Sequence, residues 1–140
     1  MAVPAAALER LVAAAQAAAA RAHAPASHFR VGAALLLADG DVVSGCNVEN
    51  ASYGLTICAE RNAVARSVVQ GGRREVTAVV VHTACDPPGY PCGACLQVLA
   101  EFAPDDGGDI DVVLVNPAGK MVHTTLRALM PHPFRFDHDA

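Results

Sequence analysis

The sequence predicts an α/β sandwich, in which a sheet of about five strands with mixed directions is covered by helices. Segments of helix and strand type follow one another in the order α-β-β-α-β-α-β-β-α, and Gly- or Pro-containing turns separate them. The length of 140 residues fits a single domain, residues 1–140, without repeat or linker. With 53% hydrophobic and 17% charged residues, the chain should bury a sizeable core and a subunit interface.

The first half of this pattern begins with an alanine-rich helix. It should run from Ala5 to Ala22, because alanine has the highest helix propensity, and Pro25 ends it. The apolar segment from Phe29 to Leu37 predicts a strand. Asp39-Gly40 is typical of a tight hairpin turn, and a second strand follows at Val42-Val43.

The middle of the chain predicts a second helix and a buried strand. Polar residues crowd at Gly45 to Asn50, and a helix should run from about Thr56, its expected cap, to Val69, with Gly71-Gly72 as its stop. The run from Val76 to His82 predicts a buried strand.

The second half repeats this alternation. Cys85 to Tyr90 is rich in Pro and Gly and predicts a loop, after which Pro91 suits the first turn of a third helix. The remaining elements are a turn at Asp105 to Asp109, a strand at Ile110 to Val115, a hairpin turn at Asn116 to Gly119, a strand at Met121 to Thr124, a short helix at Leu126 to Met130, and an irregular end at Pro131 to Phe136.

The charge of the chain argues against several partners. Ten Lys and Arg against fourteen Asp and Glu give a net charge of −4 with no basic run, so we expect no nucleic acid polymer as a partner. The stretch from Ala5 to Ala20 is interrupted by Glu9, Arg10 and Gln16, so we expect neither a targeting peptide nor a membrane span or membrane partner. A cytoplasmic location is the resulting expectation, and there five cysteines favour metal binding over disulfides.

Three cysteines and one glutamate form the candidate metal site. Cys58 and the pair Cys92 and Cys95 stand at expected helix starts, where free backbone N–H groups and a partial positive charge favour thiolates. Three protein ligands leave a fourth tetrahedral position on Zn²⁺ for water, which is typical of a catalytic site. Glu60, in Cys58-Ala59-Glu60, then supplies the carboxylate that moves protons. Residues two apart on a regular helix face different ways, so Cys58 and Glu60 share a pocket only if that turn sits edge-on to the metal.

Charge balance points to two more residues. Three thiolates leave a zinc site at −1, so a nearby cation should compensate. Arg61 is the expected donor to a cysteine sulfur, and Gln97 is a second candidate from the other helix.

Other interpretations of these residues remain open at this point. The three cysteines could be unliganded core thiols, or they could hold a structural zinc with Cys46, Cys85 or one of six histidines as fourth ligand. A non-catalytic zinc-binding module would leave Glu60 without a role.

Four motifs follow one another in order along the chain. They are Ser27-His28-Phe29-Arg30-Val31-Gly32-Ala33, Gly45-Cys46-Asn47-Val48-Glu49-Asn50-Ala51-Ser52-Tyr53, Cys58-Ala59-Glu60-Arg61 and Pro91-Cys92-Gly93-Ala94-Cys95. With these motifs the sequence resembles the small homotetrameric cytidine deaminases, and the resemblance covers roughly Pro25 to Phe134. The sequence departs from the family at Leu96, where Arg is common, and at Asn62, where Thr is frequent.

The resemblance implies a three-layer α/β/α sandwich, one Zn²⁺ per subunit and hydrolytic deamination of cytidine and 2′-deoxycytidine in pyrimidine salvage. It implies that Phe29 packs against the pyrimidine ring, that Asn47 and Glu49 bind the sugar hydroxyls, and that the backbone of Ala59 binds the base. Without it, Phe29 would be read as a core residue, and Asn47 and Glu49 as loop-stabilising residues.

The resemblance also implies active sites shared between subunits of a homotetramer. Ala51, Tyr53 and Phe134 would then reach the pocket of a neighbouring chain. The nearest rival in the same superfamily is a deaminase of another aminopyrimidine compound, such as a nucleoside antibiotic, and the sugar contacts expected of Asn47 and Glu49 argue against it.

Overall fold

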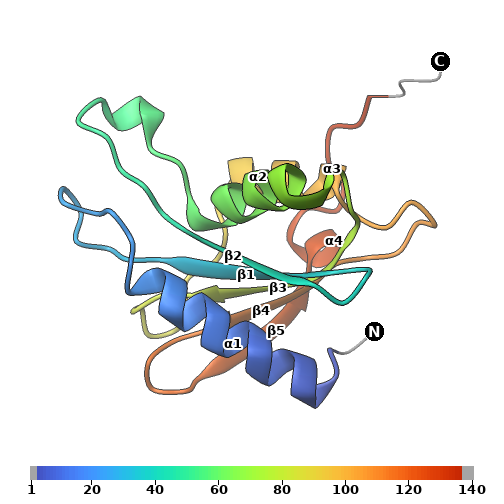
Figure 1. Ribbon diagram of the computed structural model, residues 1–140, viewed down its shortest axis with the longest axis horizontal. Coiled ribbons are helices and arrows are strands. Elements are labelled where there is room, and N and C mark those ends of the chain that lie inside the picture. The colour runs from blue at the N-terminus through green and yellow to red at the C-terminus, as the bar shows by residue number, and fades with distance from the viewer. Residues whose placement is uncertain (1–2, 137–140) are drawn as a thin grey trace.

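The computed structural model describes residues 3–136, which form one five-stranded sheet with helices on both faces (Figure 1). The strands are β1 (Gly32–Leu37), β2 (Val42–Cys46), β3 (Val76–His82), β4 (Asp111–Val115) and β5 (Met121–Thr125). The helices are α1 (Ala5–Ala19), α2 (Ala59–Gly71), α3 (Gly93–Glu101), α4 (Leu126–Leu129) and a 3₁₀ turn, η1 (Tyr53–Leu55). The strand order is β2-β1-β3-β4-β5, with β3 and β4 parallel and the other neighbours antiparallel. The mixed five-stranded sheet predicted from the sequence is confirmed.

The helices form the two outer layers of a three-layer sandwich. In Figure 1, α1 crosses one face of the sheet, whereas α2 and α3 lie side by side on the other. Side chains of β3 alternate between the two sides. Val79 and Val81 pack in the core that includes Ala63 of α2, and Val80 packs in the core that includes Leu11 of α1.

Two glycines allow the helices to approach the sheet closely. A Cβ at Gly45 of β2 would lie 2.4 Å from Ala63 N and 2.7 Å from Ala59 O, both main-chain atoms of α2. On the opposite face, a Cβ at Gly32 of β1 would lie 1.8 Å from Ala15 O of α1. Because β2 carries Gly45, the first turn of α2 sits directly on the end of that strand.

The predicted end of the first helix was wrong by three residues. The helix ends at Ala19 rather than Ala22, because His23 pairs with the segment around Val48. His23 N donates to Asn47 O at 3.1 Å, and Glu49 N donates to His23 O at 2.8 Å. This bridge requires an extended backbone, so the helix cannot continue to Pro25.

The predicted start of the second helix was wrong for a related reason. The helix begins at Ala59, with Cys58 as N-cap, instead of at about Thr56. Ile57 pairs with Val48 through two backbone hydrogen bonds of 2.9 and 3.0 Å, which keeps the chain extended up to Cys58. Thr56 instead closes η1 by donating from its N to Tyr53 O.

Other boundaries also differ from the prediction. Pro91 lies before the N-cap Cys92 of α3, not in its first turn. The first strand begins at Gly32, not Phe29, and the second continues to Cys46, beyond Val43. Within residues 3–136, no helix combines the length and the apolar character needed to cross a membrane.

Candidate active site

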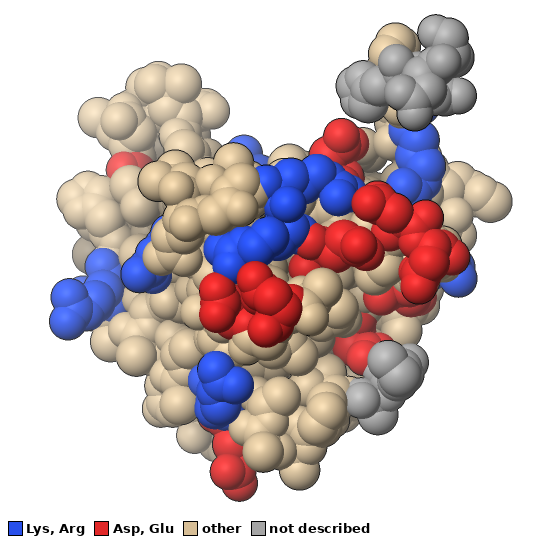
Figure 2. Space-filling model, turned by 45° about the vertical axis from the view of Figure 1, so that its right-hand side comes forward, with Lys and Arg blue, Asp and Glu red and all other residues tan. Residues whose placement is uncertain are grey.

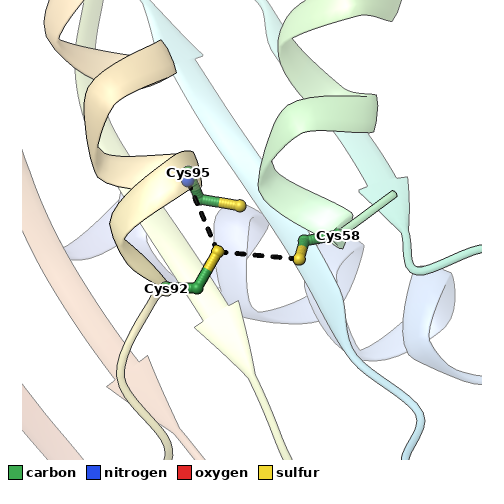
Figure 3. Close-up of side chains that lie close together, drawn as sticks. All are labelled: Cys58, Cys92 and Cys95. Carbon is green, nitrogen blue, oxygen red and sulfur yellow. Dashed lines mark hydrogen bonds between the residues drawn. The ribbon is translucent and has the colours of Figure 1, made fainter. Parts of the chain in front are cut away.

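Three cysteine thiols meet between the starts of α2 and α3 (Figure 3). Cys58 is the N-cap of α2, Cys92 is the N-cap of α3, and Cys95 lies one turn into α3. Their sulfur atoms all lie within 4.8 Å of one another, and the Sγ atoms of Cys58 and Cys92 are 3.7 Å apart. Among the residues that the structure describes, Cys46 and Cys85 lie outside this group, so neither is a fourth ligand.

The surroundings of the thiols suit a zinc site. Cys95 N donates to Cys92 Sγ at 3.4 Å. Burial by itself raises the pKa of Cys92, but hydrogen bonds, above all from the Cys95 backbone, bring that pKa below its ordinary value. Burial and the charge of Glu60 raise the pKa of the fully buried Cys95. Zn²⁺ favours soft thiolate ligands and deprotonates a coordinating thiol, so this donor set fits zinc.

Glu60 lies beside the cysteines and is only 4% exposed. Burial raises the pKa of its carboxyl, against the opposing influence of its own backbone N–H, Arg61 and Cys95. Cys58 has extended backbone angles, φ −71° and ψ 158°, and so lies outside the helix. The two-residue spacing therefore does not point Cys58 and Glu60 apart, because both side chains approach Cys95.

Arg61 supplies positive charge next to the cluster. Its Nη2 donates to Cys58 Sγ at 3.4 Å, and contacts with the thiols of Cys58 and Cys95 raise the pKa of its guanidinium. Leu96 is buried in the core beneath α3. Gln97 donates from Nε2 to Phe134 O at 2.8 Å and so attaches the C-terminal segment to α3.

Asn47 and Glu49 organise the segment from residue 26 to 31. Asn47 is buried, accepts from Val31 N at 2.8 Å and donates to Phe29 O at 2.7 Å. The Glu49 carboxylate accepts hydrogen bonds from Ala26 N and from the backbone and hydroxyl of Ser27. The Ser27 hydroxyl, in spite of some desolvation, holds the pKa of Glu49 below its usual range.

The other expected substrate residues differ in exposure. Phe29 is 41% exposed, and Tyr53, Ala51 and Phe134 are also exposed. Ala59 is buried at the first position of α2, between Cys58 and Glu60. The structure thus brings Ala59 to the cysteine cluster and places Phe134 against α3 through Gln97.

Two polar residues of this region had no role in the sequence-based prediction. Ser27 accepts from Phe29 N at 3.0 Å while donating to Glu49, so it joins the two residues. The Ser-x-Phe spacing is a signal for this turn, because Ser side chains often bind the backbone two residues on. Asn62 bonds the backbone carbonyls of Cys46 and Ile57, which belong to two separate segments that precede Cys58, and no local pattern points to that.

A mixed sheet that gathers three thiols at two helix starts, beside a buried carboxylate, defines a zinc-dependent hydrolytic deaminase. Residues 6–106 match the model of the cytidine and deoxycytidylate deaminase zinc-binding region. The chain belongs to the cytidine and deoxycytidylate deaminase family.

Relatives and solved structures agree with this assignment. The chain is 48% identical to a cytidine deaminase of Halalkalibacterium halodurans over 113 residues, which cover 81% of this chain and 83% of that protein. It is 44% identical to a cytidine deaminase of Sporosarcina psychrophila, covering 91% and 90% of the two chains. The crystal structure of cytidine deaminase from Burkholderia pseudomallei superposes with a TM-score of 0.82 at 44% identity, covering 90% of this chain and 98% of that one.

Proposed function

We propose that this chain hydrolyses cytidine and 2′-deoxycytidine to uridine and 2′-deoxyuridine with release of ammonia, as a step of pyrimidine salvage. The observation that carries this proposal is the buried carboxylate of Glu60 beside the cluster of Cys58, Cys92 and Cys95. The likeness to cytidine deaminases over most of the chain supports the choice of substrate.

The residues around the cluster account for the chemistry. Cys58, Cys92 and Cys95 would hold one zinc ion per subunit, and that ion would supply a water molecule of lowered pKa as the nucleophile. Glu60 accepts a proton from the water that adds to C4 of the pyrimidine and delivers that proton to N3. Glu60 then moves the remaining hydroxyl proton to the amino group as the C4–N bond breaks. Because Glu60 is buried, it exchanges these protons with the substrate and not with bulk water.

Hydrogen bonds connect three of the proposed substrate-binding residues, namely Phe29, Asn47 and Glu49, directly or through Ser27. Phe29 packs against the pyrimidine ring, Asn47 and Glu49 bind the sugar hydroxyls, and the backbone of Ala59 binds the base. The hydrogen bond between Asn47 and Phe29 supports a common pocket for base and sugar. Because sugar contacts define a nucleoside, they favour cytidine over other aminopyrimidines.

We also propose that the chain acts as a single catalytic domain in a cytoplasmic homotetramer with shared sites. Apolar side chains that are exposed in one chain, among them Tyr53, Leu55 and Phe134, support burial against a second copy. Ala51, Tyr53 and Phe134 would then complete a neighbouring pocket. The free cysteines fit a reducing compartment.

The surface charge supports a free nucleoside rather than a polymer as substrate. Figure 2 shows a face on which Lys and Arg lie against Asp and Glu. Arg73 pairs with Asp105, and Arg74 pairs with Asp39 and Asp41, at distances between 2.7 and 3.1 Å. Arginines paired in this way have little charge left for a phosphate backbone.

Glu60→Gln tests the proposed function. The variant keeps the shape of the side chain but not its basicity, so we expect loss of cytidine deamination by about 10²- to 10⁴-fold with zinc content and fold retained. The assay is the fall in absorbance of cytidine, and Glu9→Gln, on the exposed surface of α1, is the matched control. Equal activity in wild type and Glu60→Gln would refute the mechanism. A wild type that binds zinc but deaminates no cytidine would favour a non-catalytic module or another substrate.

A further inference from the structure

Asn62 lies in the first turn of α2, one residue after Arg61, and its side chain bonds to two other segments. Its Nδ2 donates to Cys46 O at 2.8 Å and to Ile57 O at 3.4 Å. Cys46 is the last residue of β2, and Ile57 immediately precedes Cys58. One amide group therefore connects the end of a strand to the residue before a zinc ligand.

The two segments joined by Asn62 carry different parts of the proposed site. The segment that starts at Cys46 continues to Asn47 and Glu49, the proposed sugar-binding residues. The segment that starts at Ile57 continues to Cys58 and Glu60. The backbone pair between Val48 and Ile57 links the same two segments farther along. Asn62 adds a side-chain contact to this backbone pair and extends the connection to Cys46 O.

We propose that Asn62 is a positioning residue that fixes the nucleoside-binding segment relative to the zinc ligand Cys58 and the proton carrier Glu60; this inference rests on the proposed function. Its amide has two donor hydrogens, one for each carbonyl. A threonine hydroxyl has a single donor hydrogen and could bond only one of the two carbonyls at a time. Asn62 therefore gives this chain a double connection across the site.

Arg66, on the same helix as Asn62, makes a contact between α2 and β2 that serves as a comparison for a purely structural role. One turn after Asn62, Arg66 donates from Nη1 to Ser44 O at 3.1 Å. This contact joins the same helix to the same strand but touches neither Ile57 nor Cys46. Arg66→Met therefore removes a helix-to-strand contact without disturbing the segments of the site.

The experiment compares Asn62→Asp, Asn62→Thr and Arg66→Met in the full chain. Asn62→Asp keeps the shape of the side chain but replaces Nδ2, the donor to both carbonyls, with a carboxylate oxygen that cannot donate. We expect it to weaken zinc binding and to raise the KM for cytidine, each by about 10-fold, as loss of a group that orients metal ligands typically does. Asn62→Thr should show a smaller part of each effect, because its hydroxyl can still donate to one carbonyl, and Arg66→Met should show neither.

Zinc affinity is measured with zinc alone, by competition with a chromophoric chelator, and thermal unfolding is followed in parallel. The inference would be overturned if Asn62→Asp kept the zinc affinity and the KM of wild type while its midpoint of unfolding fell as in Arg66→Met. If Asn62→Asp does not fold, wild-type values in Asn62→Thr would overturn it equally. Because zinc affinity is measured without substrate, a failure of the proposed cytidine activity is distinguished from a failure of this inference.

Discussion

A methyl group added at Gly45 tests how closely α2 must approach β2. The new Cβ would lie 2.4 Å from Ala63 N and 2.7 Å from Ala59 O, which are main-chain atoms that no rotamer change can move. Ordinary van der Waals contact begins at about 3.4 Å, so the first turn of α2 has to retreat by about 1 Å. Ala59 lies between Cys58 and Glu60, and both residues move with it.

The expected magnitude follows from this displacement. A misplacement of about 1 Å in a catalytic constellation can cost about 10²-fold, so we expect kcat/KM of Gly45→Ala to fall by about two orders of magnitude. Overpacking should lower the free energy of unfolding by about 1–3 kcal/mol. Cytidine deamination followed by absorbance, together with thermal unfolding, measures both effects.

Gly32→Ala provides the control on the opposite face of the sheet. Its Cβ would meet Ala15 O of α1 at 1.8 Å, a more severe clash at a position that faces away from α2. We expect this variant to lose at least as much stability as Gly45→Ala, while its folded fraction, assayed at low temperature, keeps a kcat/KM close to wild type. Wild-type kcat/KM in Gly45→Ala, or an equal loss in folded Gly32→Ala, would refute the reasoning.

Two charged residues give further predictions. Arg61→Gln should weaken zinc binding by about 10-fold, because it removes the guanidinium that donates to Cys58 Sγ. Competition with a chelator measures the zinc affinity, and an affinity equal to wild type would contradict this prediction. The pKa of Glu49 in the folded protein lies below its ordinary value of 4.5. The ionised carboxylate therefore stabilises the fold fully above about pH 4.5, and this stabilisation is lost as the pH falls through the pKa that Glu49 has in the folded protein. Unfolding midpoints of Glu49→Gln should therefore depend less on acid between about pH 5 and 3 than those of wild type, and parallel curves would argue against this contribution.

The parts of the fold that were predicted correctly depend on local sequence patterns. The run of valines and other apolar residues in Val76–His82 gave a strand with the same bounds as β3, because a buried strand depends mainly on its own side chains. The placement of Cys58, Cys92 and Cys95 at helix starts was likewise predicted from the sequence, because it depends on the spacing of these residues from nearby helix signals along the chain.

The errors at the end of α1 and at the start of α2 share a non-local cause. The residues His23 and Ile57 both pair with Val48, and these contacts set the end of α1 and the start of α2. Helix propensity and capping patterns do not contain such long-range pairing. The double hydrogen bond of Asn62 was missed for the same reason, because one of its acceptors, Cys46 O, lies sixteen residues away.

The parallel pairing of β3 with β4 has a consequence for how the chain folds and binds zinc. Parallel neighbours require a crossover connection, and here the crossover carries α3 with Cys92 and Cys95. We therefore expect two of the three ligands to reach Cys58 when β4 joins the sheet. Parallel pairing over a long connection is slow, because loop entropy is lost before the contacts form. Zinc that binds the completed cluster stabilises the product of this event, so we expect zinc supplied during refolding to increase the yield of native protein.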